Sequence, residues 1–198
     1  TVVIIPARFS SVRLPGKPLQ KLSIGGVQKS LIQLSWEAAS RVKSVEKVFV
    51  ATDDERIRIE AESFGANVIM TSKECKNGTE RCAEAIDTIN FDGDVVVNFQ
   101  GDAPLTPYWF VEGLIQTFKK DATTQMATPV LRLDSASLKA FRLDRSNGRI
   151  GGTTVVFDTD WNALYFSKEI IPYFDEKRFK KGEGSSIFHH VGVYAYRP

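Results

Sequence analysis

The sequence predicts an α/β fold built on a mainly parallel sheet. Short apolar runs rich in β-branched residues alternate along the chain with longer stretches whose apolar residues recur at helical spacing. This alternation is typical of β-α units, which place parallel strands in one sheet and cover it with helices. The chain has 198 residues, 42% of them hydrophobic, so it can bury a sizeable core and is not a disordered protein.

The expected elements follow one another in regular order. Strands are expected at residues 2–6, 47–52, 67–70, 95–98, 126–131 and 153–157, and helices at residues 30–42, 54–64, 79–89 and 108–119. In the second helix, Ile57, Ala61 and Phe64 share one face, Asp53 or Asp54 can cap its start, and Gly65 can end it. After Ser135 the pattern weakens into turns, and a last strand is expected at residues 189–196.

The composition excludes several classes of partner. The chain carries 26 Lys and Arg against 24 Asp and Glu, a net charge of +2, which gives no argument for binding nucleic acid. No apolar run approaches the roughly 20 residues that a membrane span needs. Cys75 and Cys82 match neither a redox pair nor a zinc site, so we expect free thiols and a cytoplasmic protein.

A cationic loop follows the first strand and is the clearest candidate site. Arg8, Arg13 and Lys17 lie there with the hydroxyl of Ser11, and the first carboxylate of the chain is Glu37. In an open α/β sheet, ligands bind at the carboxyl ends of the strands, where this loop begins. Arg and Lys together suit a triphosphate. Neither a dinucleotide-binding glycine motif nor a P-loop is present, and the alternative is a surface loop whose charges serve solubility.

A second candidate is Asp102, which follows the expected strand at residues 95–98 in a Gly-Asp turn. This position would bring its carboxylate to the same sheet edge as the cationic loop. Mg²⁺ is commonly held by one or two carboxylates together with substrate phosphates. The sequence therefore indicates a magnesium site at Asp102, although an ordinary turn aspartate is the alternative.

Several segments, taken together and in order, resemble the 3-deoxy-D-manno-octulosonate (Kdo) cytidylyltransferase family. They are Ile5-Pro6-Ala7-Arg8, Arg13-Leu14-Pro15-Gly16-Lys17-Pro18-Leu19, Ala51-Thr52-Asp53, Gly78-Thr79-Glu80-Arg81, Asn98-Phe99-Gln100-Gly101-Asp102, Ala163-Leu164-Tyr165-Phe166-Ser167 and His190-Val191-Gly192-Val193-Tyr194. The resemblance implies a Rossmann-like sheet of the nucleotide-diphospho-sugar transferase type, with a smaller sugar-binding and dimerisation part. It also implies Mg²⁺ dependence, a homodimer, and the reaction of CTP with Kdo to give CMP-Kdo and pyrophosphate.

The resemblance also implies roles for individual residues. Those expected to be catalytic are Arg8, Lys17 and Asp102, with Asp102 as the metal ligand. Those expected to bind the nucleotide are Ala7, Arg8, Ser11, Arg13, Lys17, Asp53, Gly78, Arg81 and Gln100. Those expected to bind the acidic sugar are Gln100, Lys168, His190 and Tyr194. From the residues alone, Thr79 can simply start a helix, and His189 and His190 can be a half-buried pair in a strand.

We expect residues 1–130 to form the nucleotide-binding part and residues 131–198 the sugar-binding and dimerisation part, in one compact domain. The start without Met and the abrupt end at Pro198 suggest that the natural product is longer. Two departures from the family pattern are Ala103, where Glu is usual, and Lys168, where Arg is usual. They leave open a cytidylyltransferase for another acidic sugar, of the sialic or legionaminic type, or a nucleotide-binding paralogue without turnover.

Overall fold

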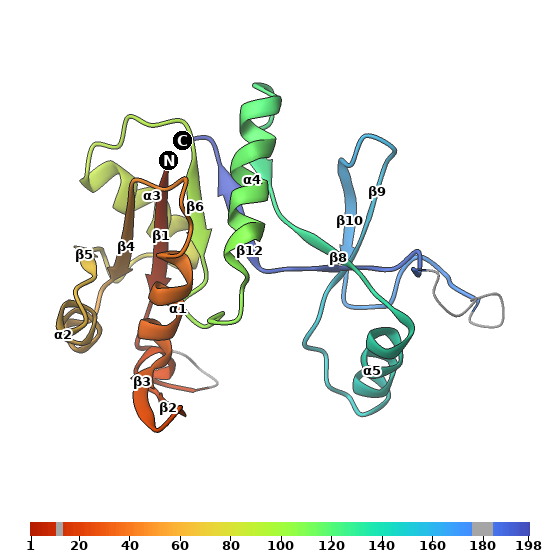
Figure 1. The fold of residues 1–198 in the computed structure, drawn as a ribbon, viewed down its shortest axis with the longest axis horizontal. Helices are drawn as coiled ribbons and strands as arrows, with labels where there is room; N and C mark the ends of the chain where they lie inside the picture. The colour runs from red at the N-terminus through yellow and green to blue at the C-terminus, as the bar shows by residue number, and fades with distance from the viewer. Residues whose placement is uncertain (11–13, 176–183) are drawn as a thin grey trace. The chain divides into compact units, whose positions relative to one another are not determined.

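The computed structural model describes residues 1–10, 14–175 and 184–198. Their contacts divide into two units, and Figure 1 shows the ribbon of each. The first unit comprises Thr1–Ala127 and Gly192–Pro198, and the second comprises Thr128–Val191. The division falls close to the expected boundary at residue 130, but the last residues of the chain return to the first unit because they pair with its sheet.

The first unit is built on a mainly parallel sheet, as predicted. Within the described residues its strand order is β5 (Asn67–Met70), β4 (Lys47–Thr52), β1 (Val2–Ala7), β6 (Val96–Phe99), β12 (Val193–Tyr196) and β7 (Met126–Ala127). β1 pairs in parallel with β4 and β6, whereas β12 runs antiparallel to β6 and β7. The centre of β1 is fully buried, and burying each Val or Ile side chain stabilises the fold by about 1.5–3 kcal/mol.

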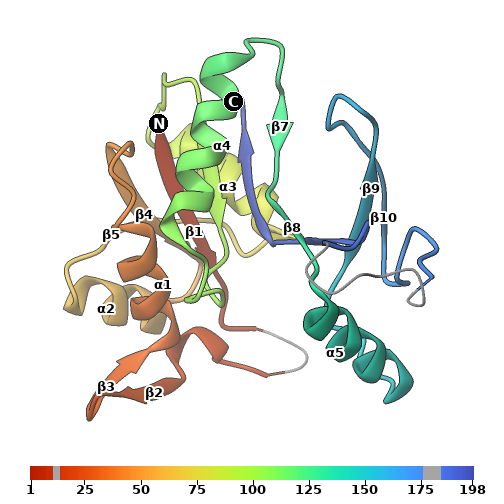
Figure 2. The same ribbon diagram turned by 45° about the vertical axis from the view of Figure 1, so that its right-hand side comes forward.

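Helices cover both faces of this sheet. They are α1 (Leu31–Ala39), α2 (Glu55–Ser63), α3 (Gly78–Thr88) and α4 (Tyr108–Lys120). Cys82 and Ala85 of α3 pack on the face that carries Ile4, whereas Ile5 faces α1 on the other side. Figure 2 shows the ribbons of α1 and α3 beside the strands of this sheet. The helix starts follow the sequence: Ser30 caps α1, Asp54 caps α2 and Asn77 caps α3, each by accepting a backbone N–H.

The second unit is a small antiparallel sheet with one helix. Its strand order is β10 (Ala163–Ser167), β9 (Thr154–Phe157), β11 (Phe188–His190) and β8 (Val130–Arg132), and α5 (Ser135–Ser146) follows β8. Leu133, Leu138 and Ile187 form its buried core, to which Phe141 of α5 adds partly buried surface. This core is small because α5 buries only Leu138 completely.

Several elements differ from the predictions. The strand expected at residues 126–131 is two short strands, since Pro129, which has no N–H, separates β7 from β8. The strand expected at residues 189–196 is also two, β11 and β12, which join different sheets on either side of Gly192. α5 and the hairpin of β2 (Lys21–Ile24) and β3 (Val27–Ser30) were not expected.

No helix in the described ranges is long and apolar enough to cross a membrane. Both cysteines are free, with Cys82 buried and Cys75 half-buried.

The end of β6 approaches β1 so closely that Gly101 has no room for a side chain. A Cβ there would lie 3.0 Å from the carbonyl oxygen of Pro6 and 3.3 Å from the Cδ1 of Ile32. We therefore expect Gly101→Ala to lower the free energy of unfolding by about 1–3 kcal/mol. Gly113→Ala is the matched control, because Gly113 lies within α4 with open space around it, and it should stabilise by up to about 1 kcal/mol.

The measurement is urea denaturation of both variants beside the unchanged protein. A Gly101→Ala variant that is as stable as the unchanged protein would contradict the close approach of β6 to β1.

Candidate functional site

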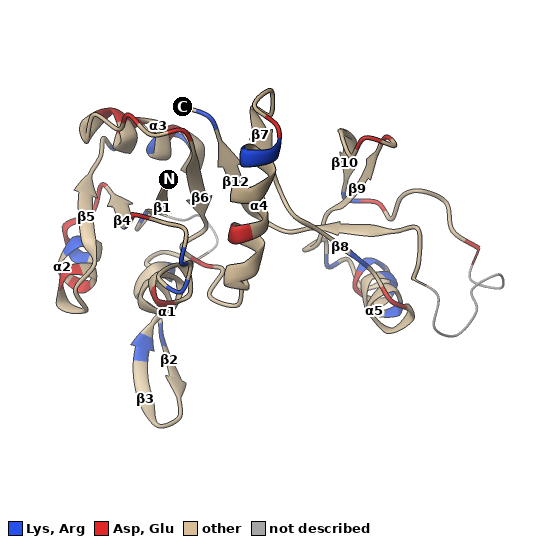
Figure 3. Ribbon diagram, turned by 45° about the horizontal axis from the view of Figure 1, so that its top comes forward, with Lys and Arg blue, Asp and Glu red and all other residues tan. Residues whose placement is uncertain are grey.

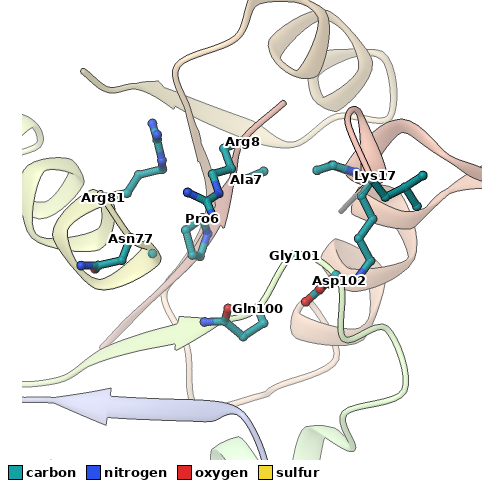
Figure 4. A pocket seen from close by; sticks show the side chains of 12 residues that line it. Pro6, Ala7, Arg8, Lys17, Asn77, Arg81, Gln100, Gly101 and Asp102 are labelled. Carbon is teal, nitrogen blue, oxygen red and sulfur yellow. Dashed lines mark hydrogen bonds and ion pairs between the residues drawn. The ribbon is translucent and has the colours of Figure 1, made fainter. Parts of the chain in front are cut away.

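A pocket of about 480 Å³ lies at the carboxyl ends of β1 and β6, entirely within the first unit. Figure 4 shows its side chains. The lining residues are Pro6, Ala7, Arg8, Leu14, Lys17, Pro18, Asn77, Gly78, Arg81, Gln100, Gly101 and Asp102. They come from four segments that are distant in sequence: the end of β1, the segment around the short 3-10 helix η1 (Lys17–Leu19), the start of α3, and the turn after β6.

The parallel pairing of β1 and β6 explains why these segments meet. Val2 and Ile4 are in register with Val96 and Asn98, so both strands end at the same edge of the sheet. Ala7 and Arg8 leave the sheet there, as does the turn that carries Asp102. The structure therefore brings a cationic segment and a carboxylate together at one sheet edge.

Lys17 and Asp102 form an ion pair across the pocket. The Nζ of Lys17 donates to the Oδ2 of Asp102 at 2.5 Å, and Figure 4 shows the two side chains pointing toward one another. Their side chains are 41% and 47% exposed, so water screens the pair and its contribution to stability is at most about 1 kcal/mol. A charged ligand can therefore exchange places with either partner at little cost.

Arg8 is exposed, and its guanidinium projects between the two sides of the pocket. Its Nη1 donates a long hydrogen bond of 3.4 Å to the carbonyl oxygen of Lys76. Such a contact holds the guanidinium weakly, because hydrogen bonds to carbonyl oxygen are strongest near 2.9 Å. Arg8 is thus well suited to bind an anionic ligand.

The N-terminus of α3 forms another wall of the pocket. Gly78, its first residue, approaches Pro6 so closely that a Cβ would lie 3.1 Å from the Cγ of that ring. Asn77 caps the helix, and its Oδ1 accepts the N–H groups of Thr79 and Glu80 at 2.9 and 3.0 Å. A helix N-terminus carries partial positive charge and so favours an anion.

Arg81 is buried and fixed from several sides. Its Nη2 lies 3.4 Å from the Oδ2 of Asp53, and its Nη1 donates to the Oγ1 of Thr71 and the carbonyl oxygen of Ser72. The Arg81 side chain is 3% exposed and that of Asp53 is 12% exposed. Removing Asp53 would leave a buried charge unpaired, so this pair is part of the fold.

Most of the residues predicted to bind the nucleotide line the pocket. Ala7, Arg8, Lys17, Gly78, Arg81 and Gln100 line the pocket. Asp53 does not line it but contacts Arg81. Ser11 and Arg13 lie outside the described residues. Asn77 was not predicted, although the sequence Asn-Gly-Thr-Glu has the spacing of a helix cap. In the structure, Glu80 Oε2 also accepts the N–H of Lys76.

The residues predicted for the sugar lie in both units. Gln100 lines the pocket, where its Nε2 donates to the Oδ1 of Asn98 at 2.7 Å, and Tyr194 lies on β12 of the same unit. Lys168 and His190 belong to the second unit. The Nζ of Lys168 donates to the Oγ1 of Thr153 at 2.8 Å and the carbonyl oxygen of Gly151 at 3.3 Å.

His190 is half-buried in β11. Its Nε2 lies 2.9 Å from the Oγ1 of Thr128, and its ring packs edge-on against Phe166. Burial, with smaller contributions from His189 and Lys168, lowers the pKa of His190 below its usual value. The lowered pKa favours the neutral imidazole, which suits a hydrogen-bonding group.

The described residues contain no group of three or more His, Cys, Asp or Glu that could by itself hold a metal ion. Asp102 supplies one accessible carboxylate in the pocket, beside cations that suit phosphate. This fits a hard divalent cation whose other ligands come from a bound phosphate and water.

Comparison with known proteins places the chain among relatives of one kind. The sequence model of a family described as cytidylyltransferase matches residues 2–198. The 3-deoxy-manno-octulosonate cytidylyltransferase of Maricaulis maris is 42% identical over 99% of this chain and 73% of its own length. The enzyme of the same name from Bacteroides thetaiotaomicron is 41% identical over 98% of this chain and 73% of its own length.

Solved structures agree with these relatives. The chain is similar to a CMP:2-keto-3-deoxy-manno-octonic acid synthetase in complex with CTP, with a TM-score of 0.79 and 36% identity over 99% of this chain and 73% of that one. A 4-diphosphocytidyl-2C-methyl-D-erythritol synthase from Anaerococcus prevotii, 10% identical, has a TM-score of 0.54 over 99% of this chain and 70% of its own, and shares the fold.

The two neighbouring histidines predict how stability depends on pH. Burial lowers the pKa of both His189 and His190, so below about pH 6.5 the unfolded chain binds protons that the folded chain does not. The free energy of unfolding should therefore fall as the pH drops from 6.5 toward the lowered pKa values. Carboxyl groups titrate mainly at lower pH, so they change the free energy of unfolding little in this range.

Thermal unfolding between pH 7.5 and 5.5 measures this. The double variant His189→Gln and His190→Gln should show a flatter dependence of its melting temperature on pH. An equally steep dependence in the double variant would assign the effect to other groups.

Proposed function

This chain belongs to the cytidylyltransferase family, and from that premise we propose that it couples CTP to an acidic 3-deoxy-octulosonate sugar, Kdo or a modified Kdo. The products are the CMP-sugar and pyrophosphate. The observation that carries the proposal is the pocket in which Arg8, Lys17 and Asp102 meet at one sheet edge. Its cations suit a triphosphate, and its carboxylate suits the metal that accompanies one.

The first unit is proposed to bind the nucleotide. Arg8 and Lys17 would contact the phosphates, with Ser11 and Arg13 as further candidates from the same cationic segment. The start of α3, with Gly78 and Arg81, would border the cytidine. Arg81 suits that task because Asp53 and Thr71 fix its guanidinium, so its donors have a defined direction.

Mg²⁺ is part of the proposal, with Asp102 as its protein ligand. When bound, the metal would neutralise charge on the triphosphate and the departing pyrophosphate. Only the Oδ2 of Asp102 is paired with Lys17, and binding of the triphosphate would offer Lys17 a replacement partner. The exposed Lys17–Asp102 pair is thus proposed to open as the phosphates enter, so that both side chains meet the ligand.

The reaction is a displacement at the α-phosphorus. The anomeric oxygen of the sugar forms a bond to this phosphorus, the bond from phosphorus to the bridging oxygen of the β-phosphate breaks, and pyrophosphate leaves. The proton of the attacking hydroxyl is released. Arg8 and Lys17 would hold the phosphates in line and offset their charge, so orientation and electrostatics supply most of the rate.

The second unit is proposed to contribute Lys168 and His190 to binding the sugar acid. Lys168 presents a single-point cation to a carboxylate, where Arg would present a fork. It is also held by Thr153 and Gly151, which fixes its direction.

Release of pyrophosphate from CTP, measured with Mg²⁺ and a panel of sugar acids, tests the proposed function. We expect turnover with Kdo or a modified Kdo, and a loss of at least roughly 100-fold in Asp102→Asn with the fold unchanged. The matched control is Asp87→Asn, because Asp87 is exposed on α3 and does not line the pocket. It should keep full activity.

Each other outcome has a definite meaning. Turnover with a sialic or legionaminic acid alone would replace the proposed substrate. CTP binding without release from any acid would make the chain a nucleotide-binding protein. Full activity in Asp102→Asn would remove the metal assignment.

A homodimer in the cytoplasm completes the proposal. The free thiols of Cys75 and Cys82 are consistent with a reducing compartment. β10 is an edge strand in the described sheet, and Leu164 and Tyr165 on it are 67% and 63% exposed. An exposed apolar edge strand is typical of a surface that a second chain covers.

Light scattering in solution measures the oligomeric state. We expect twice the mass of one chain, and a shift toward the single-chain mass in Tyr165→Glu. Leu105→Glu is the control, since Leu105 is 92% exposed in the first unit and should tolerate the change. A single-chain mass for the unchanged protein would exclude the homodimer.

A further inference from the structure

Phe9 lies between two groups that hold its ring in place. The Cζ of Arg56, on α2, lies 3.3 Å from the centroid of the Phe9 ring, well within the distance for a cation–π contact. At the backbone, the N–H of Gly16 donates to the carbonyl oxygen of Phe9 at 2.8 Å. The segment around Phe9 is thus tied both to α2 and to Gly16.

Gly16 is required by this arrangement for two reasons. Its φ is +67°, in the left-handed region that favours glycine. A Cβ at this position would lie 2.9 Å from the Cε2 of Phe9, too close for a real contact. The Phe9 ring therefore packs directly on the backbone of Gly16.

Arg56 is itself held rigidly. Its Nε and Nη2 donate to the two carboxylate oxygens of Asp54 at 2.9 and 2.7 Å. Asp54 also accepts the backbone N–H of Arg56 at 3.0 Å as the cap of α2. A forked pair of this kind fixes the plane of the guanidinium, so the side chain of Arg56 keeps its direction relative to α2. Figure 3 shows the mixed basic and acidic positions of α2.

The contact has a direct consequence for the pocket. Arg8 precedes Phe9 and Lys17 follows Gly16, so the junction of Phe9 with Gly16 sets where these two cations leave the backbone. Phe9, Gly16 and Arg56 do not themselves line the pocket. Any effect they have on the ligand is therefore indirect and acts through neighbours that do line the pocket, such as Arg8 and Lys17.

We propose that Phe9, Gly16 and Arg56 form a clasp that positions Arg8 and Lys17 for the triphosphate, with Phe9 and Arg56 as positioning residues of the reaction. This inference rests on the proposed function, since it assigns a purpose to the geometry of the same cations. Without the clasp, the segment samples further arrangements and only a fraction of molecules is ready to bind. The apparent dissociation constant rises as that fraction falls.

The size and form of the effect follow from the contact. Loss of an exposed cation–π contact should raise the apparent dissociation constant and the KM for CTP roughly three- to fivefold. Saturating CTP draws the segment back into place, so kcat should change little. General destabilisation would instead lower the active fraction, and with it the apparent kcat, while leaving KM unchanged.

Arg56→Gln tests the clasp against a matched control on the same helix. Arg58 carries the same charge, and its described partners are Glu55 and Glu62. Calorimetric titration with CTP should show weaker binding in Arg56→Gln, whereas Arg58→Gln should bind within about twofold of the unchanged protein. Equal binding by all three proteins, or equal weakening in both variants, would overturn the clasp.

Phe9→Ala and Phe9→Tyr provide a second test. Phe9→Tyr keeps the ring and should keep the KM, whereas Phe9→Ala should show the raised KM with kcat preserved. The same KM in both Phe9 variants, or a fall in kcat alone, would overturn the positioning role. If the unchanged protein fails to bind CTP, the proposed function itself is refuted. Results from the variants alone bear only on the clasp.

Discussion

The parallel pairing of β1 with both β4 and β6 is the constraint on which the rest of the site depends. It makes the strands end at one edge, so residues far apart in sequence, such as Arg8 and Asp102, leave the sheet side by side. An antiparallel partner in place of β6 would send one of these groups to the opposite edge. The close approach at Gly101 then fixes how near the two strand ends come.

Burial divides the ion pairs around the pocket into two kinds. Arg81 and Asp53 are almost inaccessible to water, so their pair is costly to break and gives the guanidinium a fixed direction. Lys17 and Asp102 are well exposed, so their pair is weak and can be exchanged for a ligand. The net charge of +2 gives no strong overall field, so the affinity for an anion comes from these local arrangements.

The elements of the fold that the sequence predicted are those that leave a clear local signal in it. The parallel strands and α1 to α4 were found because apolar periodicity and capping residues such as Ser30 and Asp54 are local features. α5 was missed although Asp134 caps it and Leu138 and Phe141 lie at helical spacing, because this apolar stripe is short and only Leu138 is completely buried. The hairpin of β2 and β3 was missed although Gly25 and Gly26, with φ of +58° and +81°, form a turn that favours one. The sheet joined by residues 193–196 depends on contacts with β6, which no local pattern records.

The site was predictable only in part, for a related reason. Charge pattern and motif order pointed to Arg8, Lys17 and Asp102, and strand order gave the edge at which they meet. The contact of Asp53 with Arg81 and that of Arg56 with Phe9 could not be predicted from the sequence, because each depends on the distance between separate elements.

The second unit begins and ends at neighbouring points. Its ends are hydrogen-bonded together, with the Oγ1 of Thr128 donating to the carbonyl oxygen of Val191 at 3.1 Å. A module whose two ends meet in this way can change in length or sequence without altering the spacing of β7 and β12, the paired strands that flank it.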